Sequence, residues 1–153
     1  MSDWGLTNRV PAEALLAEGI VLQGELHLLT RPAYPPGPET PLEMLSRPDP
    51  FFALTVPAGG VTLVPKAQVA VITCHQQVGL ADPDRASAAK LIGLEVVMQG
   101  GSEYRGHATL ELPPSRSRAL DYVNGPGAFF SLWADDTTRY INKSHVRLIR
   151  PLD

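Results

Sequence analysis

The chain has a single cysteine, Cys74, in 153 residues. One thiol excludes an internal disulfide framework. The sequence also lacks an apolar run of the roughly 18 residues that a membrane helix needs. Its first residues, MSDWGLTNRVP, contain no apolar core of a signal peptide. These absences predict a soluble, cytoplasmic protein that does not enter a membrane.

Sequence motifs for catalysis and cofactor binding are absent as well. There is no G-x-S-x-G, P-loop or dinucleotide-binding pattern. The four histidines are scattered, and only His75 has a second candidate ligand beside it, Cys74. Neighbours on a strand point to opposite faces, so this pair suits a metal poorly, and Cys74 is expected to be half-buried at a strand end. Asp135 and Asp136 fit a turn better than a catalytic carboxylate pair. The sequence predicts no catalytic residue, metal or cofactor.

The composition is that of a globular protein, with 44% hydrophobic and 19% charged residues. Fifteen prolines and thirteen glycines imply many turns and short elements. These counts favour a mainly β fold.

Three blocks of the second half repeat blocks of the first half in the same order. LEMLSRPDPFFAL (42–54) aligns with LDYVNGPGAFFSL (120–132), VPKAQVAVIT (64–73) with INKSHVRLIR (141–150), and AEALLAEGIVLQGELHL (12–28) with LEVVMQGGSEYRGHATL (94–110). The order of the blocks and the recurring Gly-x4-Gly spacing indicate an internal duplication. We expect two tandem units, residues 1–77 and 78–153.

The duplication also decides a local ambiguity. Taken alone, PAEALLAEG has the residues of a helix, whereas its counterpart GLEVVMQGG is rich in valine and resembles a strand. Helix and strand propensities of a few tenths of a kcal/mol per residue yield easily to strand pairing. We therefore predict a strand over Ala12–Ala17.

Each unit is expected to contain five strands, with a short helix between the second and third. In the second unit the elements are Leu94–Gln99, Tyr104–Leu112, the helix Ser117–Val123, Phe129–Ala134, Thr138–Asn142 and Val146–Arg150. Phe129 and Phe130 would face opposite sides of one strand, which indicates packing on both of its faces. The stretch Asp82–Gly93 has capping residues of a helix and is expected to lead the second unit.

Five short strands with a glycine at the first hairpin resemble the Sm-like (Hfq-type) and SH3-like small barrels. VVMQGGSEYRGHATLEL resembles the first two strands of the Sm-like family, and RYINKSHVRLIRP resembles its closing strands and the turn between them. The resemblance implies that Lys143 and His145 lie on an RNA-binding surface. The alternative is a solvated turn with no specific role, and the first unit keeps Lys66 but has Gln68 in place of the histidine.

Basic residues gather in the second unit and give the sequence its one candidate binding surface. Its members are Arg105, Arg139, Lys143, His145, Arg147 and Arg150. Nucleic acid binding usually needs a clearly positive footprint, and the net charge of −3 lowers that expectation. A basic strand edge that discourages aggregation is the alternative.

The last strands of the two units differ in pattern. Ala67–Cys74 is almost wholly apolar, which predicts a strand covered on both faces, most simply by the second unit in a pseudo-two-fold pair. Ser144–Pro151 alternates apolar and basic residues, which predicts an exposed edge open to a partner or to self-association. The proline-rich segment Arg31–Thr40 is expected to be an exposed excursion outside the core.

These observations support a non-enzymatic binding or assembly module with a protein partner or self-association. An Sm-like nucleic-acid-binding protein and an enzyme with an unrecognised site are the alternatives.

Overall fold

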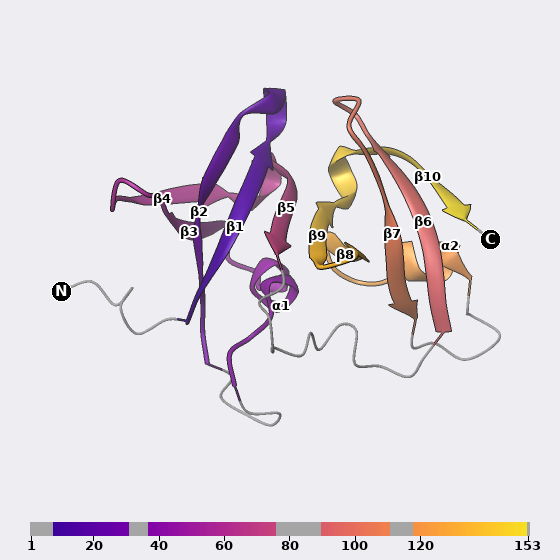
Figure 1. Cartoon of the computed structure of the whole chain (residues 1–153), viewed down its shortest axis with the longest axis horizontal. Helices are drawn as coiled ribbons and strands as arrows, with labels where there is room; N and C mark the ends of the chain where they lie inside the picture. Colours follow the sequence, from indigo (N-terminus) through magenta and orange to yellow (C-terminus); the bar gives the residue numbers. More distant parts are fainter. Residues whose placement is uncertain (1–7, 31–36, 76–89, 111–117, 153) are drawn as a thin grey trace.

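The computed structural model describes residues 8–30, 37–75, 90–110 and 118–152. The first half contains β1 (Asn8–Leu16), β2 (Val21–Leu28), α1 (Pro41–Ser46), β3 (Phe51–Thr55), β4 (Val61–Pro65) and β5 (Val69–His75). The second half contains β6 (Lys90–Met98), β7 (Glu103–Leu110), α2 (Ala119–Val123), β8 (Phe129–Ala134), β9 (Thr137–Asn142) and β10 (Val146–Leu152). The expected mainly β fold is confirmed over these described ranges, with ten antiparallel strands in one open sheet of order β10-β6-β7-β8-β9-β5-β1-β2-β3-β4 (Figure 1).

The two halves pair their strands in the same residue register. In the first two strands of each half, Ala12 faces Gly24 as Leu94 faces Gly106. The same agreement holds for three further pairs: Glu25–Thr55 matches His107–Trp133, Phe52–Val64 matches Phe130–Ile141, and Thr73–Glu13 matches Arg150–Glu95. These pairs agree with the alignment of the three sequence blocks. The paired strand positions of one half therefore have defined counterparts in the other.

The strand predicted over Ala12–Ala17 forms as part of β1, and only Ala17 lies beyond its end. β1 lies between β2 and β5 and pairs with both. Two ladders of backbone hydrogen bonds and the burial of Ala14 outweigh the helical propensity of the segment.

The predicted helix Asp82–Gly93 is wrong at its end. Lys90–Gly93 belong to β6, where Lys90 faces Leu110 and Gly93 faces His107. Pairing with β7 and burial of Ile92 decide the local structure over the capping pattern. The rest of that segment, up to residue 89, lies outside the described residues.

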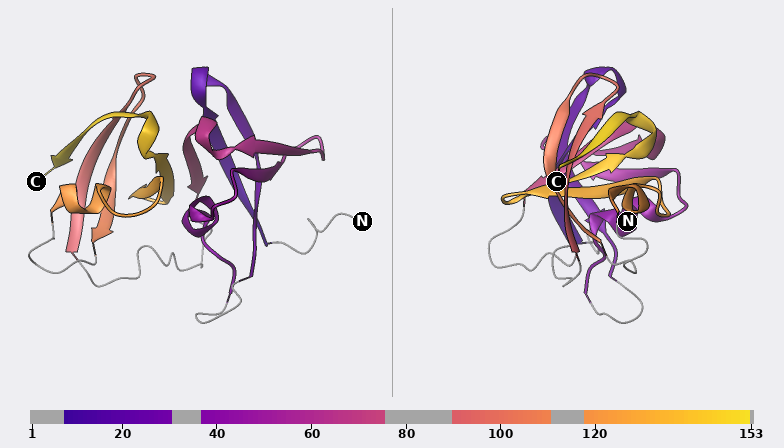
Figure 2. Two further views of the ribbon diagram at one scale, coloured as in Figure 1. Left: turned by 180° about the vertical axis from the view of Figure 1, so that it is seen from behind. Right: turned by 90° about the vertical axis from the view of Figure 1, so that its right-hand side faces the viewer.

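The two halves meet at a junction between β5 and β9, which lie side by side in the middle of the sheet (Figures 1 and 2). β5 is thus covered by the second half, as predicted. The core consists of two clusters, and β8 contributes to both. Phe129 lies in the first-half cluster with Leu26 and Leu54, and Phe130 lies in the second-half cluster with Leu94. The packing of β8 on both faces is confirmed, since both phenylalanines are buried.

The expected pseudo-two-fold pairing is wrong. A two-fold axis would bring equivalent strands together, but β9 pairs with β5, and the counterpart of β5 is β10. The halves are arranged head to tail, so the equivalent strands of the two halves follow one another in the same order across the sheet. β4 and β10 end the sheet at opposite sides (Figure 1).

The proline-rich segment Arg31–Thr40 is not wholly an excursion. Residues 31–36 lie outside the described residues, but Glu39 and Thr40 are buried. The Glu39 carboxylate accepts hydrogen bonds from Leu29 N at 3.0 Å and from the Arg47 guanidinium at 3.0 Å. Thr40 caps α1 through the backbone N–H of Glu43. Polar anchoring, which apolar patterns do not reveal, attaches this end of the segment to the first half.

Gly106→Ala is expected to destabilise the protein by roughly 1–3 kcal/mol, because a Cβ at this position would collide with the backbone carbonyl of Trp133. Gly24 faces the backbone of Thr55 in the same way, which explains why both halves keep this glycine. Urea unfolding checks the result, with Gly60→Ala as the control because no atom lies within 4 Å of its added Cβ. Equal losses of stability in the two variants would contradict the collision.

Candidate functional site

Two of the six basic residues of the predicted surface pair with one buried carboxylate. Glu95 on β6 accepts hydrogen bonds from Arg105 on β7 at 2.7 Å and from Arg150 on β10 at 2.9 Å. The hydrogen bonds from Arg150 and Arg105 hold the pKa of Glu95 below its ordinary value. This ion-pair cluster fastens β10 to β6.

Glu95→Gln is expected to lower the thermal midpoint at neutral pH, because it removes the carboxylate shared by the two arginines. Since the pKa of Glu95 is depressed in the folded state, its stabilisation is present above the unfolded pKa of about 4.3 and is lost as the pH falls through the lower folded pKa. Thermal unfolding across this acidic range should show the wild type and variant converging. Glu25→Gln is the control, because Glu25 pairs with Arg9 only at 3.7 Å on the surface and should matter little at any pH.

The other arginines and the histidine contact other parts of the chain. Arg139 stands over the ring of Tyr104, with the guanidinium carbon 4.8 Å from the ring centroid. Arg147 donates to the backbone carbonyl of Gln99 at 3.0 Å, and His145 Nε2 lies 2.8 Å from the carbonyl oxygen of Ala67. Each of these three residues therefore has a partner of its own within the chain.

Lys143 has an anchoring role that its counterpart shares. Its ammonium donates to the carbonyl of Gly125, after α2, at 2.7 Å. Lys66 donates to the carbonyls of Met44 and Arg47, at the end of α1, at 3.0 and 2.9 Å. Burial lowers the pKa of both lysines. Lys143, which the resemblance placed on an RNA-binding surface, thus links the turn before β10 to the end of α2. Lys66 links the turn before β5 to the end of α1 in the same way.

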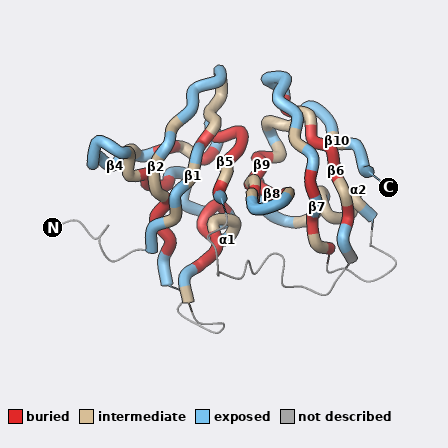
Figure 3. The backbone as a smooth tube through the Cα atoms, in the orientation of Figure 1, coloured by how far each residue is buried: buried red, intermediate tan, exposed pale blue. Residues whose placement is uncertain are grey.

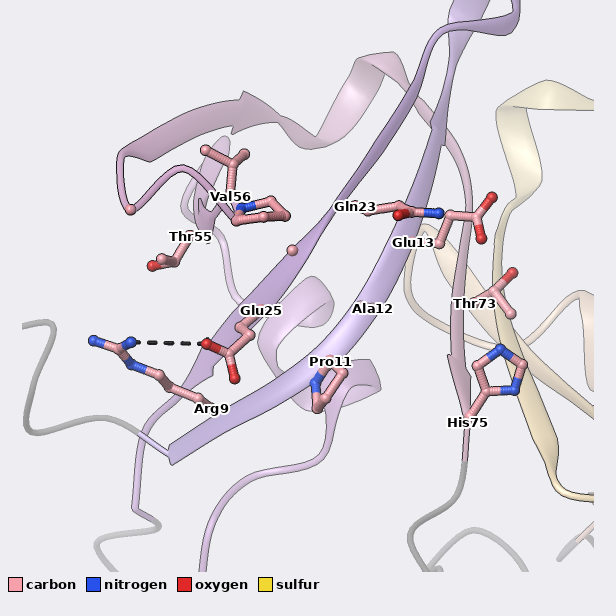
Figure 4. A pocket seen from close by; sticks show the side chains of 13 residues that line it. Arg9, Pro11, Ala12, Glu13, Gln23, Glu25, Thr55, Val56, Thr73 and His75 are labelled. Atoms are coloured by element: carbon pink, nitrogen blue, oxygen red, sulfur yellow. Dashed lines mark ion pairs between the residues drawn. The ribbon is translucent and has the colours of Figure 1, made fainter.

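A hollow of about 610 Å³ lies over β1 and β2 in the first half, beside β5 and the turn after β3 (Figure 4). Glu13, Gln23 and Thr73 line it at the counterpart positions of Glu95, Arg105 and Arg150. The hollow thus lies where the second half has its ion-pair cluster. Within the described ranges, no group of three or more His, Cys, Asp or Glu side chains is placed to hold a metal ion.

The ends of the sheet carry exposed apolar side chains. At the β3–β4 end, Phe51 is 53% exposed and Leu63 is 61% exposed, whereas their counterparts Phe129 and Tyr140 are 3% and 4% exposed. At the other end, Leu148 of β10 is 38% exposed, although its counterpart Val71 is buried. Figure 3 shows buried residues along β5 and β9 and exposed residues on β4 and β10.

The sequence predicted one of these two edges. β10 is the last strand of the sheet, as its alternating pattern indicated. The β4 edge was missed, because VTLVP is apolar enough to suit a buried strand. One available signal is Pro65, which stands where β9 has Asn142 and cannot donate a backbone hydrogen bond.

Comparisons with protein-family models, curated proteins and solved structures found no match. Among the described residues, no helix has both the length and the apolar character needed to cross a membrane.

Proposed function

We propose that the chain is a non-enzymatic binding or assembly module, built from two duplicated small barrel units, that acts through the edge strands β4 and β10. The observation that carries the proposal is the contrast in exposure at equivalent positions. Side chains buried at the internal junction have counterparts exposed at the two ends of the sheet. Edge strands with unpaired backbone groups add further strands readily, and exposed apolar residues beside them supply specificity. The lone thiol of Cys74 fits a cytoplasmic location.

The basic residues support a role in nucleic acid binding less well. Phosphate recognition needs cationic groups that are free to replace counterions. Arg105 and Arg150 share the single negative charge of Glu95, and Lys143 is directed at a backbone carbonyl. We therefore expect no binding of short RNA at low salt. Tight binding that weakens steeply with added salt would favour the nucleic-acid alternative.

The proposal is tested by capture from a lysate of the native host with tagged protein. Leu63→Asp/Leu148→Asp places a charge at each edge, and Leu91→Asp places one at an exposed residue of β6 outside the part that pairs with β10. Proteins, including the chain itself, should be captured by the wild type and Leu91→Asp but not by the double variant. Capture that is equal with all three proteins would overturn the proposed function.

A further inference from the structure

We propose that copies of this chain assemble head to tail, with β4 of one copy pairing with β10 of the next. The inference rests on the proposed function, because it names a second copy as the partner of the two edges. At the internal junction β9 pairs antiparallel with β5. The counterparts of these strands, β4 and β10, are the two ends of the sheet. Each chain therefore carries one completed junction and both parts of a second one.

One part of the junction is an apolar plug. Phe129 and Tyr140 of the second half lie in the first-half core cluster. There they join Leu45, Val69 and Ile72, which are all buried. The second half thus completes the core of the first half. The counterparts of the plug residues are Phe51 and Leu63, which are exposed in the single chain.

The other part is an apolar socket on the second half. The counterparts of Leu45, Val69 and Ile72 are Val123, Val146 and Ile149. These three pack against the second-half cluster but are only partly buried. The difference in burial between the two sets of residues follows from what covers them. The plug covers the first set, and no plug from the same chain covers the second. Phe51 and Leu63 of another copy have the apolar character to fill this socket.

The internal ladder also gives the expected register. There Val71 faces Ile141, Ile72 faces Tyr140 and Thr73 faces Arg139. The equivalent pairs between copies are Leu148 with Val64, Ile149 with Leu63 and Arg150 with Thr62. No two charges of the same sign face each other in these pairs, so the contact carries no repulsion of the kind that separates like-charged strands.

Two differences in sequence between the halves are expected to make this contact weaker than the internal one. Pro151 follows Arg150 and has no N–H to donate, so we expect the ladder to end there. Pro65 replaces Asn142, whose side chain spans the internal junction. We therefore expect an association that depends on protein concentration. A contact between different surfaces of identical subunits closes into a ring or extends as a fibre, according to the rotation between copies.

The test uses two variants that each block one edge. Leu63→Asp introduces a negative charge into the plug, and Leu148→Asp introduces one on β10 at the expected contact. Both leucine side chains are exposed in the single chain. Sedimentation velocity over a range of concentrations should show wild-type species larger than one chain, while each variant alone stays monomeric. A mixture of the two variants should form a one-to-one dimer, because each still has the edge that the other has lost. Leu91→Asp should assemble as the wild type does.

Folding of every variant is checked by far-UV circular dichroism and thermal unfolding before sedimentation. Self-association of either blocked variant alone, or a mixture that stays monomeric while the wild type assembles, would overturn the head-to-tail pairing. A wild type that is monomeric at every concentration would also overturn it. If edge-dependent capture of a different protein then persists, the proposed function stands with another partner, whereas edge-independent capture overturns both.

Discussion

Val71→Asp is expected to abolish folding of the chain. Val71 is 1% exposed and lies on β5 of the first half, yet its side chain belongs to the second-half core cluster. An aspartate there removes an apolar contact and leaves an unpaired charge or an unsatisfied carboxyl in the core. Such changes cost more than about 4 kcal/mol, a large part of the roughly 5–15 kcal/mol that stabilises an ordinary domain. Far-UV circular dichroism and thermal unfolding provide the measurement.

Leu148→Asp is the matched control, because Leu148 holds the counterpart position on β10. Its side chain is 38% exposed, so the new charge stays in contact with water. We expect a thermal midpoint within a few degrees of the wild type, corresponding to less than about 1 kcal/mol. A Val71→Asp protein with an unchanged midpoint, or equal losses in the two variants, would contradict the assignment of β5 as a covered strand.

The same pair of strands shows what periodicity can and cannot predict. A continuous apolar run in Ala67–Cys74 and an alternating pattern in Ser144–Pro151 correctly distinguish a covered strand from an edge. The pattern reports how many faces of a strand are buried, but not which neighbour buries them. For that reason the sequence could not separate a two-fold pair from the head-to-tail junction of β5 with β9.

Phe51 makes the same point for a single residue. The repeated Phe-Phe pair predicts similar burial in both halves, but Phe51 is exposed and Phe129 is buried. Both residues lie in the same pattern, Pro-x-x-Phe-Phe-x-Leu. The difference arises because β8 lies near the junction with the first half, while β3 is next to the end strand β4. Burial here depends on the neighbouring unit, which local sequence does not encode.

The candidate site was harder to predict, since a residue type does not determine its partner. Lys143 and Arg150 are cationic surface candidates by sequence, but a carbonyl and a carboxylate hold them in the structure. The sequence did contain a sign that Lys143 is structural. Its counterpart Lys66 is present in the first half, where the other basic residues of the predicted surface have no basic counterpart. Retention of one residue in both halves is typical of a structural role that both halves need.

Asn142→Asp is expected to cause the second large loss of stability, by weakening the internal junction. Asn142 is 3% exposed, and its side-chain amide donates to the carbonyl of Val69, in the first half, at 2.9 Å. Its own carbonyl oxygen accepts from the backbone N–H of Ser144 at 3.0 Å. Aspartate keeps this second bond but turns a carboxylate oxygen towards the Val69 carbonyl, which leaves two acceptors facing each other. The expected cost is roughly 2–4 kcal/mol at neutral pH.

The pH dependence separates this electrostatic cause from a simple loss of packing. Burial without a donor raises the pKa of the new aspartate in the folded state, so its penalty should shrink as the pH falls through that raised pKa. Asn142→Ala, which also loses the bond to Val69, should show no such recovery relative to the wild type. Pro65→Ala at the counterpart position should cost at most about 1 kcal/mol, because β4 is an end strand and forms no junction within the chain. Urea unfolding between neutral and mildly acidic pH measures all three, and a penalty for Asn142→Asp that is small or constant with pH would show that this amide does not hold the two halves together.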